Sequence, residues 1–355
     1  SLLSSTRTPI GRNPLLRNNA SPTKEKFHVI SSNSTSPLGS STGTDLGDDE
    51  KSEILGTPIL KTRFAHRVIE NKPKASLKPS QLTPRKRVVI NMDLVDVVDP
   101  SKRDIEVLKS EGFHAFKYEF NDKKNMTIHL EDIGRLNPNI YLNDALIWFF
   151  MKLSLEKCMT ANKELSNDVC VLDTFFYSTV RSGIVPQWIK RLDILQKHVV
   201  FMPINENHHW SLAVIFGLNE VAFQVKQFGS SSVRPKLLIL DSLGSASGRS
   251  FNRKVITVIK NVFEVHGLPS IPPKNFLTFR TDNPCQDNMT DCGVYLLHYT
   301  NVIMSQLKMF LDSIEEFEGT KLEMGEFWKP EEISEYRLKM KNQLKEMGNT
   351  YPQVD

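Results

Sequence analysis

Residues 283–299 read NPCQDNMTDCGVYLLHY, a polar turn that runs directly into an apolar stretch of helix-forming composition. Cys292 stands at the junction between the two parts. Backbone N–H groups and the helix dipole stabilise negative charge at the start of a helix, which favours the thiolate form of a cysteine placed there. The pattern indicates Cys292 as a nucleophile. The alternative is a buried cysteine that merely begins a core helix.

The polar turn also carries Gln286, six residues before this cysteine. A glutamine amide that folds back beside the sulfur can donate a hydrogen bond to an oxyanion formed there. We therefore predict Gln286 as an oxyanion donor.

Upstream, residues 198–216 read HVVFMPINENHHWSLAVIF, which indicates two short strands around a polar turn. Paired histidines begin the second strand. Side chains alternate between the two faces of a strand, so His209 and Trp210 are expected to point in opposite directions.

A third segment, residues 237–244, reads LLILDSLG: an apolar run ends in Asp241 just before a Gly/Ser loop. Buried charges are rarely unpaired, so an acid at the tip of a core strand is expected to have a partner. Cysteine, histidine and aspartate from three elements match the roles of nucleophile, base and orienter. Taken singly, a histidine such as His209 is more often a structural residue, and a strand-end aspartate such as Asp241 is more often a cap or turn former.

The order of these motifs resembles that of the SUMO-specific Ulp/SENP family of cysteine proteases, fungal-type members included. The shared blocks are His-Trp at 209–210, Asp-Ser-Leu at 241–243 and Pro-x-Gln-x-Asn-x-x-Asp-Cys-Gly-Val at 284–294. Further agreement comes from Tyr-Leu-Asn-Asp at 141–144 and from Phe-Phe-Tyr at 175–177, ahead of Trp-Ile-Lys-Arg-Leu-Asp at 188–193. The resemblance covers about residues 117–350, and residues 126–156 look closest to the branch that edits poly-SUMO chains.

The resemblance implies a role for each site residue. Cys292 would be the nucleophile, His209 the general base and acid, Asp241 the orienter of the imidazole, and Gln286 the oxyanion donor. Trp210 would cover the channel that holds the Gly-Gly terminus of the substrate.

Two residues of the Tyr-Leu-Asn-Asp block are expected to bind substrate. Tyr141 stands where the family has tryptophan, which keeps an aromatic lid but makes it smaller. Asp144 would meet a basic residue of the bound modifier. The alternative for Asp144 is the first turn of a helix capped by Asn143, where an acid suits the helix dipole.

The fold implied is a papain-like α+β cysteine protease domain over residues 117–350 in rearranged order, with histidine and aspartate preceding the cysteine. Apolar spacing predicts helices from Asn143, over about residues 253–266, and from Pro330. The apolar stripe of the last helix is interpreted as core packing. Residues 219–235, with their Gly/Ser cluster, are predicted to be an inserted surface loop.

Residues 1–87 form a basic region rich in Ser, Thr and Pro, and we predict disorder because it cannot bury enough apolar surface. Residues 1–90 hold 15 Lys and Arg against 7 Asp and Glu. Five Ser-Pro or Thr-Pro pairs are either phosphorylation sites or ordinary linker composition. The cluster at 85–87, Arg-Lys-Arg, suggests nuclear import or solvated surface.

Residues 88–116 are predicted to connect the two regions. Their β-prone acidic run at 88–99 resembles a SUMO-interaction motif, which adds a strand to the edge of the modifier's sheet. A strand packed on the protease's own body is the preferred interpretation.

Composition narrows the function further. The chain has 355 residues without an apolar run of membrane-spanning length, so we expect a soluble protein with no membrane partner. No direct nucleic-acid partner is indicated. Its four cysteines form no Cys-x-x-Cys pair, which argues against zinc and disulfides, and no cofactor is expected. The initial serine and the lack of a signal peptide suggest a fragment from a reducing compartment, which we take to be the nucleus.

These patterns predict a thiol isopeptidase that removes SUMO from modified lysines, with SUMO conjugates and poly-SUMO chains as partners. Two rivals remain open. One is a protease for another ubiquitin-like modifier such as NEDD8, and the other is a non-catalytic SUMO-binding module built on residues 88–99 and the basic region. The intact set of Cys292, His209, Asp241 and Gln286 argues against the second.

Overall fold

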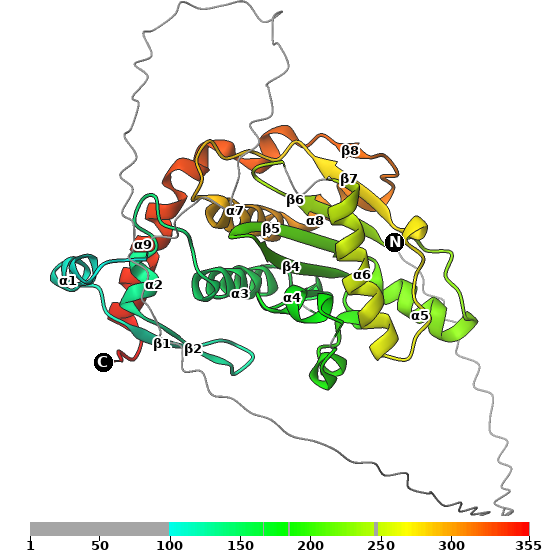
Figure 1. The fold of residues 1–355 in the computed structure, drawn as a ribbon, viewed down its shortest axis with the longest axis horizontal. Coiled ribbons are helices and arrows are strands. Elements are labelled where there is room, and N and C mark those ends of the chain that lie inside the picture. Colours follow the sequence, from blue (N-terminus) through cyan, green and yellow to red (C-terminus); the bar gives the residue numbers. More distant parts are fainter. Residues whose placement is uncertain (1–98, 166, 184, 245–247, 355) are drawn as a thin grey trace, which may run out of the picture. The chain divides into compact units, whose positions relative to one another are not determined.

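The computed structural model describes residues 99–354, except for 166, 184 and 245–247 (Figure 1). The predictions on the disordered region 1–87, its phosphorylation sites, the basic cluster and the β-prone run up to residue 98 lie outside the described residues. The resemblance of that run to a SUMO-interaction motif therefore stays a prediction.

The described residues contain one six-stranded sheet, in which spatial order follows chain order. Its strands are β3 (Val169–Val171), β4 (Val199–Glu206), β5 (His209–Phe216), β6 (Lys236–Leu240), β7 (Leu277–Thr281) and β8 (Lys321–Leu322). β4, β5 and β6 are antiparallel, whereas the β3–β4, β6–β7 and β7–β8 pairs are parallel. A separate two-stranded ribbon pairs β1 (Phe116–Glu119) with β2 (Asn125–Ile128).

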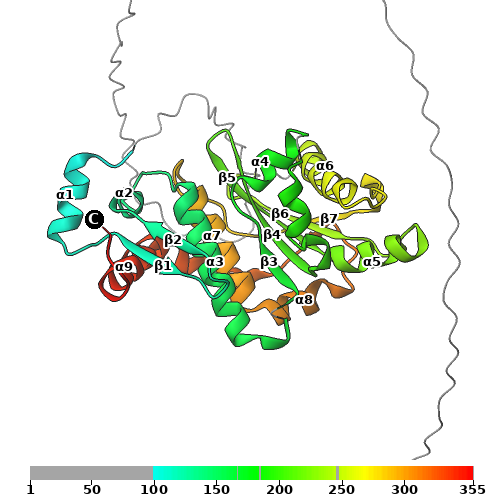
Figure 2. The same ribbon diagram turned by 90° about the horizontal axis from the view of Figure 1, so that it is seen from below.

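Helices cover both faces of the large sheet (Figure 2). The helices of the described residues are α1 (Lys102–Ser110), α2 (Leu130–Gly134), α3 (Asp144–Ala161), α4 (Phe176–Arg181), α5 (Leu218–Phe228), α6 (Arg249–Val265), α7 (Cys292–Ser305), α8 (Leu307–Glu315) and α9 (Ile333–Thr350). α3 and α7 lie on one side of the sheet, and α4, α5 and α6 on the other. The prediction of a mixed α+β domain is confirmed.

The central strand β5 separates two apolar cores. Leu212 and Val214 belong to the core shared with α3 and α7, whereas Ala213 and Ile215 belong to the core shared with α4, α5 and α6. The predicted alternation along this strand is thus confirmed, and since both faces are covered, the whole strand is buried.

A two-residue turn joins β4 to β5. Asn207 and His208 both adopt left-handed backbone conformations, with φ of 53° and 59°, as two-residue hairpin turns require. The turn pairs Glu206 with His209. The Glu206 carboxylate accepts hydrogen bonds from Tyr177 (2.9 Å), from Lys254 (3.1 Å) and from an arginine of α4, so the hairpin is tied to helices on one face of the sheet.

The predicted surface loop over residues 219–235 is wrong for its first part, which is the helix α5. Val221, Ala222 and Val225 are buried at helical spacing, and a glycine with positive φ lies at each end of the helix. The prediction weighted the Gly/Ser cluster and overlooked this apolar spacing. Only the residues after Gly229 form a loop.

The other predicted helices are present with small changes of boundary. Asn143 caps α3, because its side-chain oxygen accepts a hydrogen bond from the N–H of Leu146 at 3.1 Å. α6 begins at Arg249, earlier than predicted, and α9 begins shortly after Pro330. Three apolar residues of the predicted α9 stripe are buried, which confirms core packing: Met340, Leu344 and Met347.

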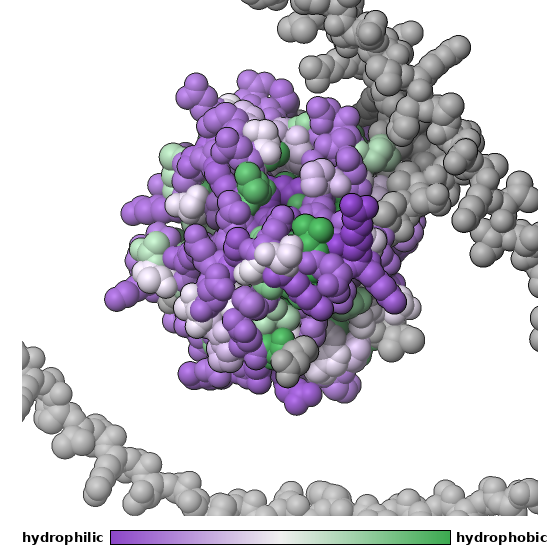
Figure 3. All heavy atoms as spheres, turned by 90° about the vertical axis from the view of Figure 1, so that its left-hand side faces the viewer, coloured by the Kyte–Doolittle hydropathy of each residue, from purple (hydrophilic) through white to green (hydrophobic). Residues whose placement is uncertain are grey.

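The surface over α1, α2 and α9 is mainly hydrophilic, with apolar side chains scattered singly (Figure 3). Scattered apolar residues of this kind are normal on protein surfaces. None of the helices in the described part of the chain is long and apolar enough to cross a membrane.

Candidate active site

The sheet brings the predicted site residues together at one end of its central strands β5 and β6. β5 begins with His209, and β6, which runs antiparallel to it, ends immediately before Asp241. α7 begins with Cys292 and packs against β5. Residues far apart in the sequence therefore meet where two strands and a helix end.

His209 and Asp241 form a short buried contact. Nε2 of His209 lies 2.5 Å from Oδ1 of Asp241, and the two residues are 9% and 4% exposed. Oδ1 also accepts a hydrogen bond from the N–H of Leu243 at 3.1 Å. The carboxylate is thus held by its own loop while it orients the imidazole ring.

The charge state of His209 follows from its neighbours. Burial alone would lower its pKa, but the contacts with Asp241 and with Cys292 outweigh burial and raise the pKa to about 9. Nδ1 has no hydrogen-bond partner among the described residues, so it is the ring nitrogen left for the sulfur. At neutral pH the arrangement favours a protonated imidazole beside the sulfur of Cys292.

Cys292 is 1% exposed at the start of α7, and its helix approaches the neighbouring segment closely. A Cβ atom added to Gly293 would lie 3.0 Å from Cβ of Leu142, which is tighter than about nine in ten such contacts in proteins. The polar turn that leads into Cys292, residues 283–292, is called the nucleophile turn below. Because residue 293 is a glycine, this turn packs directly against Leu142.

The two aromatic residues predicted to bind substrate, Trp210 and Tyr141, lie close to Leu142 and Cys292. The indole Nε1 of Trp210 donates a hydrogen bond to the carbonyl oxygen of Leu142 at 3.0 Å. Burial raises the pKa of Tyr141, and the charge of the nearby Cys292 adds to this effect. The Tyr141 hydroxyl is buried, with no hydrogen-bond partner in the described part of the chain.

Gln286 is joined to the residue that follows Asp241. Its amide oxygen accepts a hydrogen bond from the Ser242 hydroxyl, and its backbone N–H donates to the Ser242 carbonyl at 3.0 Å. Its amide nitrogen donates to the carbonyl oxygen of Asn288 at 2.7 Å. An amide nitrogen carries two protons, so one proton remains for a further acceptor.

Asp144 lies apart from this group. It is the first residue of α3 and partly exposed, and Asn143 rather than Asp144 caps the helix. Among the described contacts, no hydrogen bond or ion pair joins it to the three catalytic candidates. Its position suits the helix dipole, and the predicted contact with a modifier stays a prediction.

Four residues joined by hydrogen bonds to the site or to its turn were not predicted: Ser242, Asn288, Asp291 and Arg337. Asp291 accepts hydrogen bonds from the side chains of Asn288 and Arg337. Ser242 had a signal, because it directly follows the candidate aspartate. Asn288 and Asp291 lie in the candidate turn but were assigned no role. Arg337 had none, because it lies on the last helix, far from the turn in sequence.

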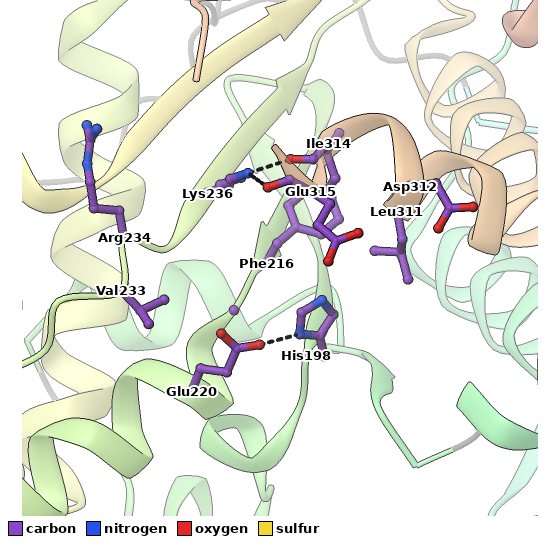
Figure 4. Close-up of a pocket in the computed structure, with 11 residues that line it drawn as sticks. His198, Phe216, Glu220, Val233, Arg234, Lys236, Leu311, Asp312, Ile314 and Glu315 are labelled. Atoms are coloured by element: carbon purple, nitrogen blue, oxygen red, sulfur yellow. Dashed lines mark hydrogen bonds and ion pairs between the residues drawn. The ribbon is translucent and has the colours of Figure 1, made fainter. Parts of the chain in front are cut away.

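A cavity of about 350 Å³ lies at the opposite end of the central strands (Figure 4). His198 and Glu220 face each other across it at 3.6 Å, and the Lys236 ammonium donates to the carbonyl oxygens of Ile314 and Glu315 at the end of α8. None of the predicted site residues lines this cavity. Among the described residues, no cluster of three or more His, Cys, Asp or Glu side chains could hold a metal ion.

Residues 141–325 match the C-terminal catalytic domain of the Ulp1 protease family. The chain is 27% identical over 219 residues to ubiquitin-like-specific protease 2 of Schizosaccharomyces pombe, which covers 53% of this chain and 34% of the relative. It is 26% identical over 265 residues to sentrin-specific protease 7 of Rattus norvegicus, which covers 55% of this chain and 25% of the relative. The chain thus spans about a third or less of the length of these relatives.

A solved structure supports the fold. A crystal structure described as that of a de-sumoylating protease superimposes with a TM-score of 0.57 at 20% identity, covering 66% of this chain and 92% of that one. At this identity the likeness concerns the fold, and it agrees with the predicted protease architecture.

Proposed function

We propose, because the chain belongs to the Ulp1 protease family, that it is a thiol isopeptidase which cleaves SUMO from modified lysines. The observation that carries the proposal is the buried 2.5 Å contact of His209 with Asp241 beside Cys292. The names of the two relatives, a ubiquitin-like-specific and a sentrin-specific protease, support a modifier of the ubiquitin type as substrate.

In the proposed reaction, the Cys292 thiolate attacks the carbonyl carbon of the modifier's last glycine. The carbonyl oxygen becomes an oxyanion, which accepts hydrogen bonds from the free amide proton of Gln286 and from a backbone N–H near Cys292. One such donor typically contributes on the order of a hundredfold or more to turnover.

His209 carries the proton in both halves of the reaction. Its imidazolium protonates the departing lysine amine, which leaves the modifier bound to Cys292 as a thioester. The neutral imidazole then takes a proton from the water that hydrolyses this thioester. Asp241 keeps Nε2 occupied, so that Nδ1 exchanges the proton.

Substrate selection is assigned to the two aromatic side chains and to α3. Trp210 and Tyr141 would leave a passage that only residues without Cβ can enter, which selects a Gly-Gly terminus. Asp144, at the start of α3, would meet a basic residue of the modifier.

We extend the proposal to poly-SUMO chains, because residues 126–156 look closest to the chain-editing branch. The test is a time course on poly-SUMO chains beside a SUMO precursor at equal concentration. Faster loss of chains supports the extension, and faster processing of the precursor contradicts it.

Nuclear localisation is a separate proposal, supported by the Arg-Lys-Arg cluster at residues 85–87. A fluorescent fusion should accumulate in the nucleus, and alanine at the three positions should reduce this accumulation. An unchanged distribution of the variant would remove the cluster from the argument.

The decisive experiment for the main proposal is reaction with SUMO that carries a C-terminal electrophile, run beside ubiquitin and NEDD8 equivalents. We expect a covalent adduct with SUMO that is absent in Cys292→Ala. The adduct should be preserved in Glu220→Gln, a change at the opposite end of the strands. An adduct with NEDD8 alone would show that NEDD8, and not SUMO, is the modifier that the enzyme recognises. The lack of any adduct would favour the non-catalytic SUMO-binding module.

A further inference from the structure

Arg337, on the last helix, makes a set of contacts that the proposed reaction does not use. Its side chain is only 12% exposed. Nε donates to Oδ1 of Asp291 at 3.1 Å, and Nη2 donates to the same oxygen. Nη1 donates to the carbonyl oxygens of Arg135 (2.8 Å), Asn137 (3.1 Å) and Ile140 (3.1 Å).

These contacts join two segments that flank the sulfur. Asp291 directly precedes Cys292, and residues 135–140 lead directly into Tyr141 and Leu142. A single guanidinium therefore ties the nucleophile turn to the segment that supplies the aromatic lid. Arginine suits this position, because its planar fork offers several donors in fixed directions and stays charged when buried.

Asp291 places a carboxylate one residue before the sulfur-bearing Cys292. Its side chain is 28% exposed. Among the described residues, Cys292 affects the pKa of His209 from β5, which also contacts Asp241, and the pKa of Tyr141. A carboxylate without a counterion at position 291 would disfavour the thiolate, and Arg337 supplies that counterion.

The contact also reaches the predicted oxyanion donor. Oδ2 of Asp291 accepts a hydrogen bond from the Asn288 amide at 2.9 Å, and Oδ1 of Asn288 accepts from the N–H groups of Thr290 and Asp291 at 3.0 Å each. The carbonyl oxygen of Asn288 in turn accepts from Gln286. A continuous path of hydrogen bonds runs from α9 to Gln286.

We propose that Arg337 is a positioning residue that neutralises Asp291 and holds the nucleophile turn against residues 135–140. The inference rests on the proposed function, because it assigns a role in thiol chemistry to a residue outside the reacting groups. A purely structural Arg337 would stabilise α9 without affecting the charge state of the sulfur.

The test uses the 355-residue chain and two readouts. The first is the rate of Cys292 alkylation by iodoacetamide as a function of pH, followed by mass spectrometry, and the second is cleavage of a SUMO conjugate. In Arg337→Met we expect the midpoint of the alkylation profile to rise by about one pH unit. We expect kcat to fall about tenfold or more, with KM changed less than about threefold.

Lys341→Met is the matched control. Lys341 lies one turn further along α9 and donates to the side chain of Asn137 at 2.9 Å, but it has no ion pair with Asp291. Its alkylation midpoint should equal that of the parent chain. Equal midpoints in Arg337→Met and Lys341→Met would overturn the proposal, whatever happens to thermal stability.

Two further variants separate charge from geometry. Arg337→Met combined with Asp291→Asn should return the midpoint to the parent value, because the uncompensated charge is gone. Arg337→Lys should keep the midpoint and lose turnover, because lysine keeps the charge but not the planar fork. If thermal unfolding shows that the methionine variant does not fold, Arg337→Gln replaces it, with the same expected rise of the midpoint. A midpoint raised in Arg337→Lys as well would overturn the charge argument.

Alkylation needs no modifier, so it distinguishes the two proposals. If SUMO is not the substrate, the midpoint still shifts in Arg337→Met. If Arg337 is only structural, SUMO cleavage persists in the parent chain and the midpoint stays in place.

Discussion

Two histidine–carboxylate pairs lie at opposite ends of the strands of the same sheet. His209 and Asp241 lie 2.5 Å apart, with side chains 10% and 1% exposed. His198 and Glu220 lie 3.6 Å apart, with side chains 35% and 53% exposed. The residue types are alike, but only the first pair is shielded from water and adjoins a cysteine.

Burial, rather than the pairing itself, separates the two. Exposed ion pairs contribute little because water and salt screen them, whereas a buried carboxylate strongly favours the protonated imidazole. The cavity of Figure 4 opens beside the exposed pair, while the catalytic candidates are packed among apolar side chains. An open cavity is therefore a poor guide to the chemistry of this molecule.

The largest expected effect separates the two pairs directly. Asp241→Asn should lower kcat by about a thousandfold to ten-thousandfold, because the imidazole loses the partner that fixes its tautomer. Glu220→Gln should leave kcat within about twofold, since that pair is screened. Both are measured on a SUMO conjugate, and comparable losses in the two variants would refute the distinction.

Gln286→Ala tests the donor that is joined to Ser242. We expect kcat to fall about a hundredfold with little change in KM, because the lost hydrogen bond forms mainly in the transition state. Steady-state kinetics give both values. An unchanged kcat would exclude Gln286 from the oxyanion site.

Gly293→Ala tests how tightly the residues around Cys292 are packed. The added methyl group would press on Leu142, and overpacking of this kind typically lowers the free energy of unfolding by about 1–3 kcal/mol. At Gly248 the added carbon would meet nothing within 4 Å, so Gly248→Ala should cost less than about 1 kcal/mol. Urea unfolding of both variants measures the difference, and equal losses would contradict the close approach.

The smallest expected effect is a pH dependence confined to the buried pair. Because the pKa of His209 is raised to about 9, the imidazolium persists through neutral pH, and kcat/KM should decline only as the pH rises through about 9. Glu220→Gln should show the same alkaline limb. A decline centred near the ordinary histidine value of about 6.5 would contradict the raised pKa.

The sequence predicted the parts of the site that depend on local pattern. Cys292 begins a helix, His209 begins a strand and Asp241 follows one, and each position is marked by a change between polar and apolar residues. Motif order then indicated that the three meet. The polar turn before His209 was predicted too, but the left-handed conformation of Asn207 and His208, which sets the pairing of His209, was not.

What the sequence did not predict depends on contacts between distant segments. Arg337 reaches residues 135–140 and Asp291 only because α9 packs across α7, and no spacing records that packing. α5 was missed for a different reason: its apolar spacing is present, but the Gly/Ser cluster after it outweighed the spacing. The cavity beside His198 is lined by residues of β5, β6, α5 and α8, which share no motif.

The two-residue turn before His209 limits how this protein can change in length. Insertions are ordinarily accepted in surface loops, and the segment after Gly229 is a place where they would be. One extra residue in the turn at Asn207 and His208 would instead shift β5 by one position and reverse the faces of all its side chains. His208 would then take the place of its neighbour in the pairing, so a duplicated histidine offers no spare copy of the catalytic one.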